Sequence, residues 1–294
     1  MSASVASGAP DYVVIGHFTV DITPWGRALG GTAIYAGLTA ARAGLRVGVL
    51  TRGNLAGLPR QVREELEMVS REVELVIQSA GATTTFANEE VAGRRVQTLH
   101  AWGGEIELSG LPADWRAPAI MHIAPVAQEL EPRSLSRVAP GYLGVTPQGW
   151  VRRWAARLPA RVRFEELKLT NEMNARFDAM VVSSEELAAT RESFDAVSKR
   201  GLAVVTRGRR GATALDRGHV IEVPGYPGTQ VDTTGAGDVF AGMLFLMRGR
   251  GEPIVRSLRH ASAAAALSIG ARGISGVPHF EQVAELVEIE ESRP

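Results

Sequence analysis

One short run of residues has the composition of a site for phosphoryl transfer. It extends from Asp232 to Asp238 and reads Asp-Thr-Thr-Gly-Ala-Gly-Asp, with an apolar helical stretch directly after it. Small residues at a helix start let a ligand approach unpaired backbone N–H groups, and the helix dipole favours negative charge there. A transferring phosphoryl group needs such donors because its charge is dispersed in the transition state. The run therefore predicts an anion hole at Gly235, Ala236 and Gly237.

Asp238 places a carboxylate beside this predicted anion hole. A carboxylate next to a phosphate is unfavourable unless it has a task, and accepting the proton of an attacking hydroxyl is such a task. A purely structural alternative is that the glycines form a tight turn and Asp238 caps the helix. We predict that Asp238 is the catalytic base.

The elements that must position this run alternate between strands and helices. Apolar runs bounded by turn residues predict buried strands at 12–15, 46–50, 119–123, 142–145, 179–182 and 202–206. Helical stretches are predicted at 33–43, 133–138, 150–158, 185–199, 239–247, 253–269 and 280–288, and a hairpin at 213–223. Strands joined by helical crossovers are built parallel. We expect one α/β domain over residues 11–294 and a flexible tail at 1–10.

The segment from about residue 72 to 102 has a different pattern. Val73, Leu75 and Ile77 alternate with other residues, and residues 83–91 and 95–99 flank Ala92-Gly93, which is a turn signal. This pattern predicts antiparallel strands, and we expect them to project from the main sheet as a small β lid.

Composition narrows the classes of partner and of chemistry. The 294-residue chain has a formal net charge of zero, so neither nucleic acid nor a membrane surface is an expected partner. The chain has no cysteine, which excludes disulfides and cysteine-ligated zinc, and its six histidines lack metal-ligand spacing. No signal peptide is recognisable, and no apolar stretch approaches the roughly 20 residues that span a bilayer. We expect a cytoplasmic protein.

The Asp232 to Asp238 run resembles the C-terminal signature of the PfkB/ribokinase carbohydrate-kinase family, Asp-Thr-x-Gly-Ala-Gly-Asp. The order of other features agrees with this family over nearly the whole chain. The resemblance implies a ribokinase-like, Rossmann-like three-layer α/β sandwich with a small β lid. It implies transfer of the γ-phosphoryl group of ATP to a sugar-like hydroxyl with Mg²⁺, with Asp238 as base and the amides of Gly235, Ala236 and Gly237 as anion hole.

The acceptor side of such a site is predicted near the N-terminus. Asp21 followed by Gly30 and Gly31 resembles the family's sugar site, in which the carboxylate accepts hydroxyl hydrogen bonds and the sugar lies on the glycine backbone. Tyr35 stands where the family often has an asparagine, and an aromatic ring there would fill space in which an amide binds hydroxyls. The family's Gly-x-Asp after the second strand is replaced by Thr-Arg-Gly-Asn at residues 51–54.

The donor side is predicted in the second half of the chain. Residues 206–211 resemble the family's Thr-x-Gly-x-x-Gly nucleotide loop, which assigns nucleotide contacts to Thr206, Gly208 and Gly211. Ser183 and Glu186 occupy the family's Asn-x-x-Glu, and the resemblance places Glu186 on the Mg²⁺ side through water. An N-cap with an acidic first turn explains the same residues. Ser262 lies in the late helix that lines the family's adenine pocket.

Three hypotheses follow for the function. The first is an ATP-dependent kinase of a sugar, cyclitol or similar polyol, and the second is a nucleoside kinase of the same family. The third, from another class, is a non-catalytic protein that senses a sugar or nucleotide, motivated by the changes at Tyr35 and Ser183. The altered Ser183 to Glu186 segment is similar to that of inositol-kinase-like members. The resemblance also raises a monovalent cation as a cofactor and a homodimer formed through the lid.

Overall fold

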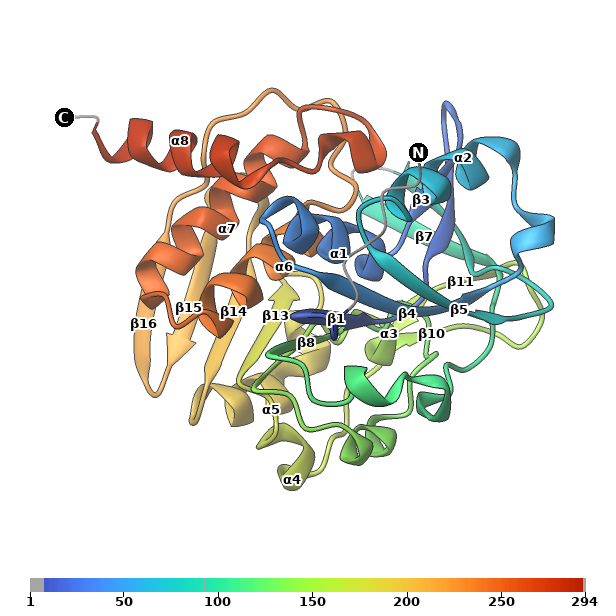
Figure 1. Cartoon of the computed structure of the whole chain (residues 1–294), viewed down its shortest axis with the longest axis horizontal. Coiled ribbons are helices and arrows are strands. Elements are labelled where there is room, and N and C mark those ends of the chain that lie inside the picture. The colour runs from blue at the N-terminus through green and yellow to red at the C-terminus, as the bar shows by residue number, and fades with distance from the viewer. Residues whose placement is uncertain (1–7, 92–93, 293–294) are drawn as a thin grey trace.

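Figure 1 shows the structure, a computed structural model of the 294-residue chain, which describes residues 8–91 and 94–292. Most of the predicted tail, at residues 1–7, and the predicted turn at Ala92-Gly93 lie outside the described residues.

A central sheet organises the chain. Its strands are β1 (Tyr12–Ile15), β4 (Val47–Gly53), β5 (Glu74–Ser79), β8 (Ile120–Ile123), β9 (Tyr142–Val145), β13 (Ala179–Ser183), β14 (Leu202–Thr206), β15 (Ala212–Asp216) and β16 (His219–Val223). Their order is β16-β15-β14-β13-β9-β8-β1-β4-β5. The pairs from β5 through to β14 are parallel, and β15 and β16 add an antiparallel hairpin at one edge. The predicted parallel sheet and terminal hairpin are confirmed.

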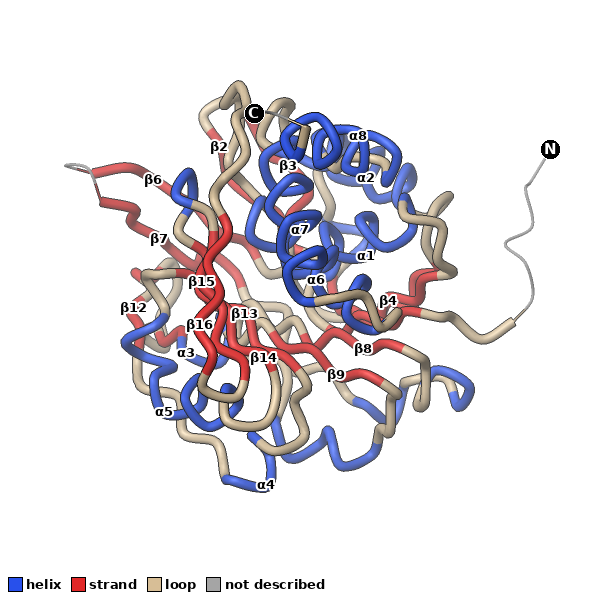
Figure 2. Tube along the Cα trace, turned by 90° about the vertical axis from the view of Figure 1, so that its left-hand side faces the viewer, coloured by secondary structure: helices blue, strands red, loops and turns tan. Residues whose placement is uncertain are grey.

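Helices cover both faces of this sheet, as Figure 2 shows. One face carries α1 (Thr32–Arg42), α2 (Arg60–Val69), α6 (Ala236–Gly249), α7 (Ile254–Ser268) and α8 (Phe280–Glu291). The other face carries α3 (Gln148–Val151), α4 (Asn171–Asn174) and α5 (Leu187–Ser198). Short 3₁₀ turns in the connections are formed by Leu55–Gly57, Leu108–Gly110, Ala113–Trp115, Pro132–Arg137, Gly208–Arg210 and Gly273–Gly276. Each face has its own apolar cluster, because the strands of a parallel sheet are buried on both sides. The predicted three-layer α/β sandwich is confirmed.

A second, smaller sheet projects from the sandwich. Its order is β11-β7-β6-β2-β3, and we call it the small sheet. Its strands are β2 (Thr19–Thr23), β3 (Gly26–Gly30), β6 (Thr85–Val91), β7 (Arg94–Ala101) and β11 (Ala160–Arg161). It therefore draws on three separate parts of the chain, whereas the sequence predicted one insert at about 72–102.

Strand β5 explains part of this difference. It pairs in parallel with β4 at the edge of the central sheet and does not belong to the small sheet. An edge strand is half-buried and shows the same alternating polarity as a projecting antiparallel strand, so the pattern of residues 73–77 fits both placements.

The predicted helix at 150–158 is the main local difference. The helix α3 ends at Val151, and Arg152–Arg153 forms the short strand β10, which pairs with β12 (Arg163–Phe164). The side-chain amide of Gln128 donates to the carbonyls of residues 149, 150 and 152 at 2.7–3.1 Å. These carbonyls would otherwise accept helical hydrogen bonds, so a tertiary contact ends the helix early.

Within the described parts of the chain, no helix has both the length and the apolar character needed to cross a membrane.

Candidate active site

The N-terminus of α6 has the backbone geometry of an anion site. Gly235 precedes the helix with a φ of +79°, and a Cβ on it would lie 2.5 Å from carbon atoms of the Tyr35 ring. Both the backbone angle and this contact therefore require glycine. Gly237 is exposed, and a Cβ there would meet no atom within 4 Å, so a ligand can approach the backbone from that side. The predicted anion-hole residues thus lie at the start of a helix of 14 residues, where first-turn N–H groups lack acceptors within the helix; the Ala236 N–H donates to the Thr233 carbonyl at 3.3 Å.

Asp238 lies in the first turn of α6 and is half-buried. Its Oδ1 accepts a hydrogen bond from the Thr32 hydroxyl at 2.8 Å and a longer one from the Gln148 side-chain amide at 3.4 Å. These partners come from the first turn of α1 and from α3. The carboxylate is thereby held where three helices meet, rather than capping its own helix, which has no side-chain cap.

A chain of polar side chains leads away from Asp238. Gln148 donates from Nε2 to Thr32 Oγ1 at 2.5 Å and accepts at Oε1 from Arg152 at 2.7 Å. Arg152 is buried and also donates to the Val126 carbonyl at 2.8 Å. Its guanidinium lies 5.3 Å from the centre of the Phe86 ring in β6, a distance at which a cation is attracted to an aromatic face. Phe86 of the small sheet is thus in contact with Arg152, the first donor in this series of hydrogen bonds.

The predicted acceptor residues lie together, next to these hydrogen-bonded side chains. Asp21 in β2 is buried and accepts from the Thr19 hydroxyl at 2.9 Å. A Cβ on Gly30 would clash with the Asp21 carboxylate, so the two strands approach this closely only with glycine there. Gly31 has a φ of +99° and starts α1 directly after β3. Because Gly30 adjoins Asp21 and Thr32 adjoins Asp238, three consecutive residues join the two carboxylates.

Tyr35 lies beneath the predicted anion hole. Its ring packs against Gly235, and only 2% of the residue is exposed. Its hydroxyl has no hydrogen-bond partner among the described residues. Burial raises the pKa of this hydroxyl, and the nearby carboxylates of Asp21, Asp232 and Asp238 raise it further. Tyr35 therefore fills space at the boundary between the two predicted halves of the site, and a direct contact with an acceptor stays a prediction.

The predicted nucleotide loop packs onto the segment that leads into α6. Thr206 ends β14, and Gly208 and Gly211 both take positive φ angles in the turn that follows. The Arg209 guanidinium donates to the Gln230 side chain at 2.9 Å, and a Cβ on Gly211 would clash with the Val223 carbonyl. These contacts hold the loop against residues 223–230, immediately before the Asp232 to Asp238 run.

Ser183 and Glu186 form a reciprocal pair before α5. Glu186 Oε2 accepts from the Ser183 backbone N–H at 2.9 Å, and Ser183 Oγ accepts from the Glu186 backbone N–H at 3.3 Å. This reciprocal pair has the hydrogen-bond pattern of a capping box, although α5 itself begins at Leu187, with Glu186 at its N-cap and no acidic residue in its first turn. Ser262 is buried and donates to the Pro224 carbonyl at 2.9 Å, so its hydroxyl holds the loop before α6. Contacts of these residues with nucleotide or metal stay predictions.

A buried carboxylate ties together two loops that border the site. Glu129 is fully buried and accepts backbone N–H bonds from His17, Val126 and Ala127 at 2.6–3.0 Å. His17 lies in the chain between β1 and Asp21, and the Val126 carbonyl accepts a hydrogen bond from the Arg152 guanidinium. Glu129 therefore fixes the chain on the acceptor side of the site.

Sequence reasoning overlooked Thr32 and Arg152 and assigned no role to Gln148. Thr32 directly follows Gly30-Gly31, and this adjacency was one available signal. Gln148 and Arg152 are spaced i, i+4, so their side chains can meet on one helical turn. That spacing alone does not reveal that the pair faces Asp238, 90 residues further along the chain.

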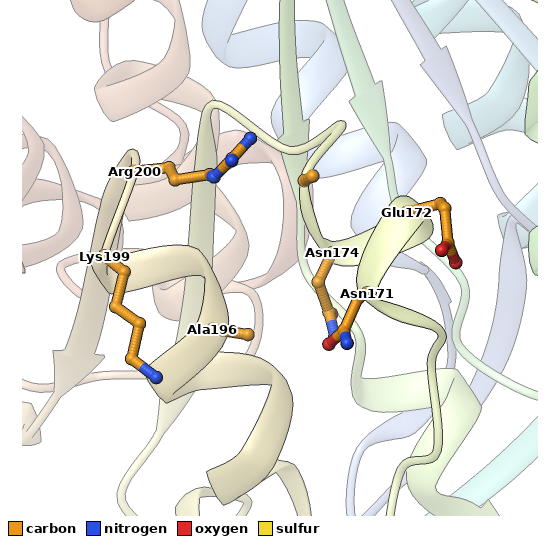
Figure 3. A pocket seen from close by; sticks show the side chains of 7 residues that line it. Asn171, Glu172, Asn174, Ala196, Lys199 and Arg200 are labelled. Atoms are coloured by element: carbon orange, nitrogen blue, oxygen red, sulfur yellow. The ribbon is translucent and has the colours of Figure 1, made fainter.

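A cavity of about 390 Å³ lies elsewhere, between α4 and the end of α5 (Figure 3). Asn171, Asn174, Lys199 and Arg200 are among the residues that line it. These residues precede β13 and β14, so the cavity is at the amino ends of the parallel strands. Ser183 and Thr206 are at the carboxyl ends of the same strands, where ligands bind in open α/β sheets, so this cavity has no part in the candidate site.

Known proteins share both the motifs and the fold. The pfkB family carbohydrate kinase description matches residues 165–279, a range that includes the nucleotide loop and the Asp232 to Asp238 run. A cytidine kinase from Thermococcus kodakarensis is 26% identical over 276 residues, covering 85% of this chain and 92% of that protein. A Klebsiella pneumoniae fructokinase is 35% identical over 122 residues, covering 36% of this chain and 40% of that protein.

Solved structures agree over most of the chain. A pyrophosphate-dependent kinase in the ribokinase family, complexed with a pyrophosphate analogue and myo-inositol, has a TM-score of 0.74 at 19% identity and covers 93% of this chain and 99% of its own. Arabidopsis thaliana ribokinase, complexed with ribose and ATP, has a TM-score of 0.64 at 16% identity and covers 96% and 99%. At such identities these two structures show the fold. The structures thus show a ribokinase fold over nearly the whole chain, and the similarity to pfkB family carbohydrate kinases covers the segment 165–279 that carries the Asp232 to Asp238 run.

Proposed function

We propose that the protein transfers the γ-phosphoryl group of ATP to a hydroxyl of a sugar, cyclitol or similar polyol. The observation that carries this proposal is the position of Asp238. Its carboxylate lies at the start of α6, beside the open backbone of Gly237, and accepts a hydrogen bond from Thr32 on the acceptor side. One group thus borders both the phosphate and the hydroxyl that attacks it.

In this mechanism Asp238 accepts the proton of the acceptor hydroxyl as its oxygen forms a bond to the γ-phosphorus. The bond from that phosphorus to the β–γ bridging oxygen breaks, and ADP leaves. The amides of Gly235, Ala236 and Gly237, with the positive end of the α6 dipole, stabilise the charge that the phosphoryl group spreads during transfer. The chain places no lysine in this anion hole, so backbone donors have the larger share of this task.

Mg²⁺ would accompany ATP and neutralise part of the phosphate charge. Among the described residues no cluster of three or more acidic or histidine side chains forms a dedicated metal site. This fits Mg²⁺, which commonly keeps several waters and binds through substrate phosphates and one or two carboxylates. Glu186 would hold it through water, using a carboxylate that Ser183 already orients. A requirement for a monovalent cation stays a prediction.

The acceptor would lie between Asp21, the backbone of Gly30 and Gly31, and the small sheet. An ionised carboxylate only accepts hydrogen bonds, so Asp21 suits the hydroxyl donors of a polyol. Closure of the small sheet over the acceptor would exclude water and limit hydrolysis of ATP. We also retain, as proposals, a cytoplasmic location and a homodimer formed through the small sheet, whose edge strands are β3 and β11.

A nucleoside kinase is the second candidate, because the cytidine kinase relative aligns with the chain over 92% of that relative's length. A sensor without activity is less well supported, since binding alone does not need a carboxylate beside an anion hole. The test is a transfer assay with myo-inositol, D-ribose, D-fructose and cytidine, each with ATP–Mg²⁺ or with pyrophosphate as donor. Phosphorylation of a polyol by ATP is the expected result. Exclusive phosphorylation of cytidine would favour the second candidate, and binding of these compounds without any transfer would favour the sensor.

A further inference from the structure

We propose that Thr32 is a positioning residue whose hydroxyl proton is directed at Asp238 by a one-way chain of hydrogen-bond donors beginning at Arg152. This inference rests on the proposed function, because it assumes that Asp238 is the base. The chain runs from Arg152 to Gln148, from Gln148 to Thr32 and from Thr32 to Asp238, at 2.7, 2.5 and 2.8 Å.

The direction of this chain follows from which groups can donate. Arginine has only donors, so the atom of Gln148 that faces Arg152 must be its carbonyl oxygen. The amide nitrogen of Gln148 then faces Thr32 and donates to its hydroxyl oxygen. The hydroxyl proton of Thr32 is thereby left to point at Asp238. An ionised carboxylate accepts this proton, and the hydrogen bond favours that ionised state and one orientation of the carboxylate.

Two of the four residues in this series of hydrogen bonds are buried, and the other two, Gln148 and Asp238, are half-buried. Thr32 is fully buried and Arg152 is 7% exposed, so water competes weakly for their hydrogen bonds. Arg152 is fixed further by the Val126 carbonyl and by the Phe86 ring of the small sheet. The orientation of Asp238 therefore depends on contacts that begin at the small sheet.

The Thr32 hydroxyl has no role in capping its own helix. The residue before α1, Gly31, forms no side-chain cap, and the acceptor of the Thr32 proton lies 206 residues away on α6. Thr39 on the same helix offers the contrast. It is equally buried, but its hydroxyl donates to the Tyr35 carbonyl of its own helix at 2.7 Å. Thr39 is therefore a matched control for the loss of a buried threonine hydroxyl.

The test compares Thr32→Val, Thr32→Ser and Thr39→Val, using whichever of myo-inositol, D-ribose, D-fructose or cytidine gives the highest rate. Thr32→Val should lower kcat about ten-fold while the KM for acceptor changes by less than about two-fold, because the lost hydrogen bond acts on the base. Thr32→Ser keeps the hydroxyl and should recover most of kcat. Thr39→Val should retain the wild-type kcat. A rise in acceptor KM with unchanged kcat in Thr32→Val would overturn the inference and make Thr32 an acceptor ligand.

The same change in an Asp238→Ala background separates this inference from the proposed function. If Asp238→Ala transfers phosphate at the wild-type rate, the proposed function fails whatever Thr32 does. If Asp238→Ala is severely impaired, Thr32→Val should add no further loss to its residual rate. An equal further loss in that background would overturn the inference alone.

A second measurement is independent of activity. Denaturant unfolding of Thr32→Val, Asp238→Ala and the double variant should give non-additive changes in unfolding free energy, because either change removes the hydrogen bond that the two side chains share. Additive changes would contradict the contact on which the inference depends.

Discussion

The two halves of the proposed site, which we call its phosphate side and its acceptor side, are built in different ways. The phosphate side is formed by consecutive residues, since the anion hole and Asp238 all belong to the start of α6. The acceptor side is assembled from β2, β3, α1 and α3, and two contacts, from Gln148 and Thr32, join it to Asp238, which lies 90 and 206 positions further along the chain. Local backbone geometry thus creates the phosphate side, whereas tertiary contacts create the acceptor side.

This difference suggests how each side should respond to substitution. A change on the phosphate side should impair the chemical step for every acceptor, because the backbone donors do not depend on which hydroxyl attacks. A change at a residue that contacts only the acceptor, such as Asp21, should alter KM and the ranking of acceptors, whereas a change at Thr32, which contacts Asp238, should act on kcat. Variants that failed to separate in this way would argue against two distinct halves.

The largest effect in this comparison is expected for Gly235→Ala. Alanine is disfavoured at a φ of +79°, and its Cβ would meet the Tyr35 ring at 2.5 Å, so the start of α6 must shift. Loss of a donor from such a hole lowers kcat on the order of 10²-fold, and we expect this for all acceptors. Gly237→Ala is the control for folding, since its Cβ meets no atom within 4 Å. If Gly235→Ala changed only the KM of one acceptor, the assignment of this side would be wrong.

A lower pH should destabilise the fold, and with it both sides of the site, through His122. This residue is buried between the Tyr12 hydroxyl and Thr146, with its ring against Phe245 of α6. Burial lowers the pKa of His122 from 6.5 to about 3, so the unfolded chain binds a proton that the folded chain refuses. Stability should therefore be complete above pH 6.5 and fall as the pH decreases towards 3.

The expected loss between pH 7 and pH 5 from this one group is about 2 kcal/mol of unfolding free energy. Denaturant unfolding at a series of pH values measures it, and His122→Gln should reduce the slope. An unchanged slope in that variant would show that other groups cause the pH dependence.

The smallest effect is expected for Asp21→Asn. The amide keeps one acceptor oxygen but loses the charge, so hydrogen bonds from acceptor hydroxyls should weaken. We expect the KM for acceptor to rise about ten-fold, with the KM for ATP unchanged. Steady-state kinetics with each substrate varied in turn provide the measurement. If only the KM for ATP rose, Asp21 would act on the donor side of the site and its assignment to the acceptor would be wrong.

The two sides also differ in how well the sequence predicts them. Local patterns of apolar residues predict the central sheet and the hairpin at its edge. The glycines and the acidic residue of the Asp232 to Asp238 run predict a phosphate site there. Thr32 and Arg152 were not recognised, because their role arises only when α1, α3 and α6 are packed together. The small sheet was recognised in part, since β6 and β7 are adjacent in the chain whereas β2, β3 and β11 join them from elsewhere. The helix predicted at 150–158 does not form, because the Gln128 side chain donates hydrogen bonds to carbonyls of α3 that would otherwise accept helical hydrogen bonds.

The most direct test of the central claim is single-turnover transfer by Asp238→Asn at saturating donor and acceptor. The product is followed as label passing from γ-labelled ATP to the acceptor hydroxyl, and binding of both ligands is measured separately by calorimetry. We expect both ligands to bind nearly as tightly as to the wild-type protein, with transfer slower by a factor on the order of 10² to 10⁴. Transfer at close to the wild-type rate would contradict the role of Asp238 as the base.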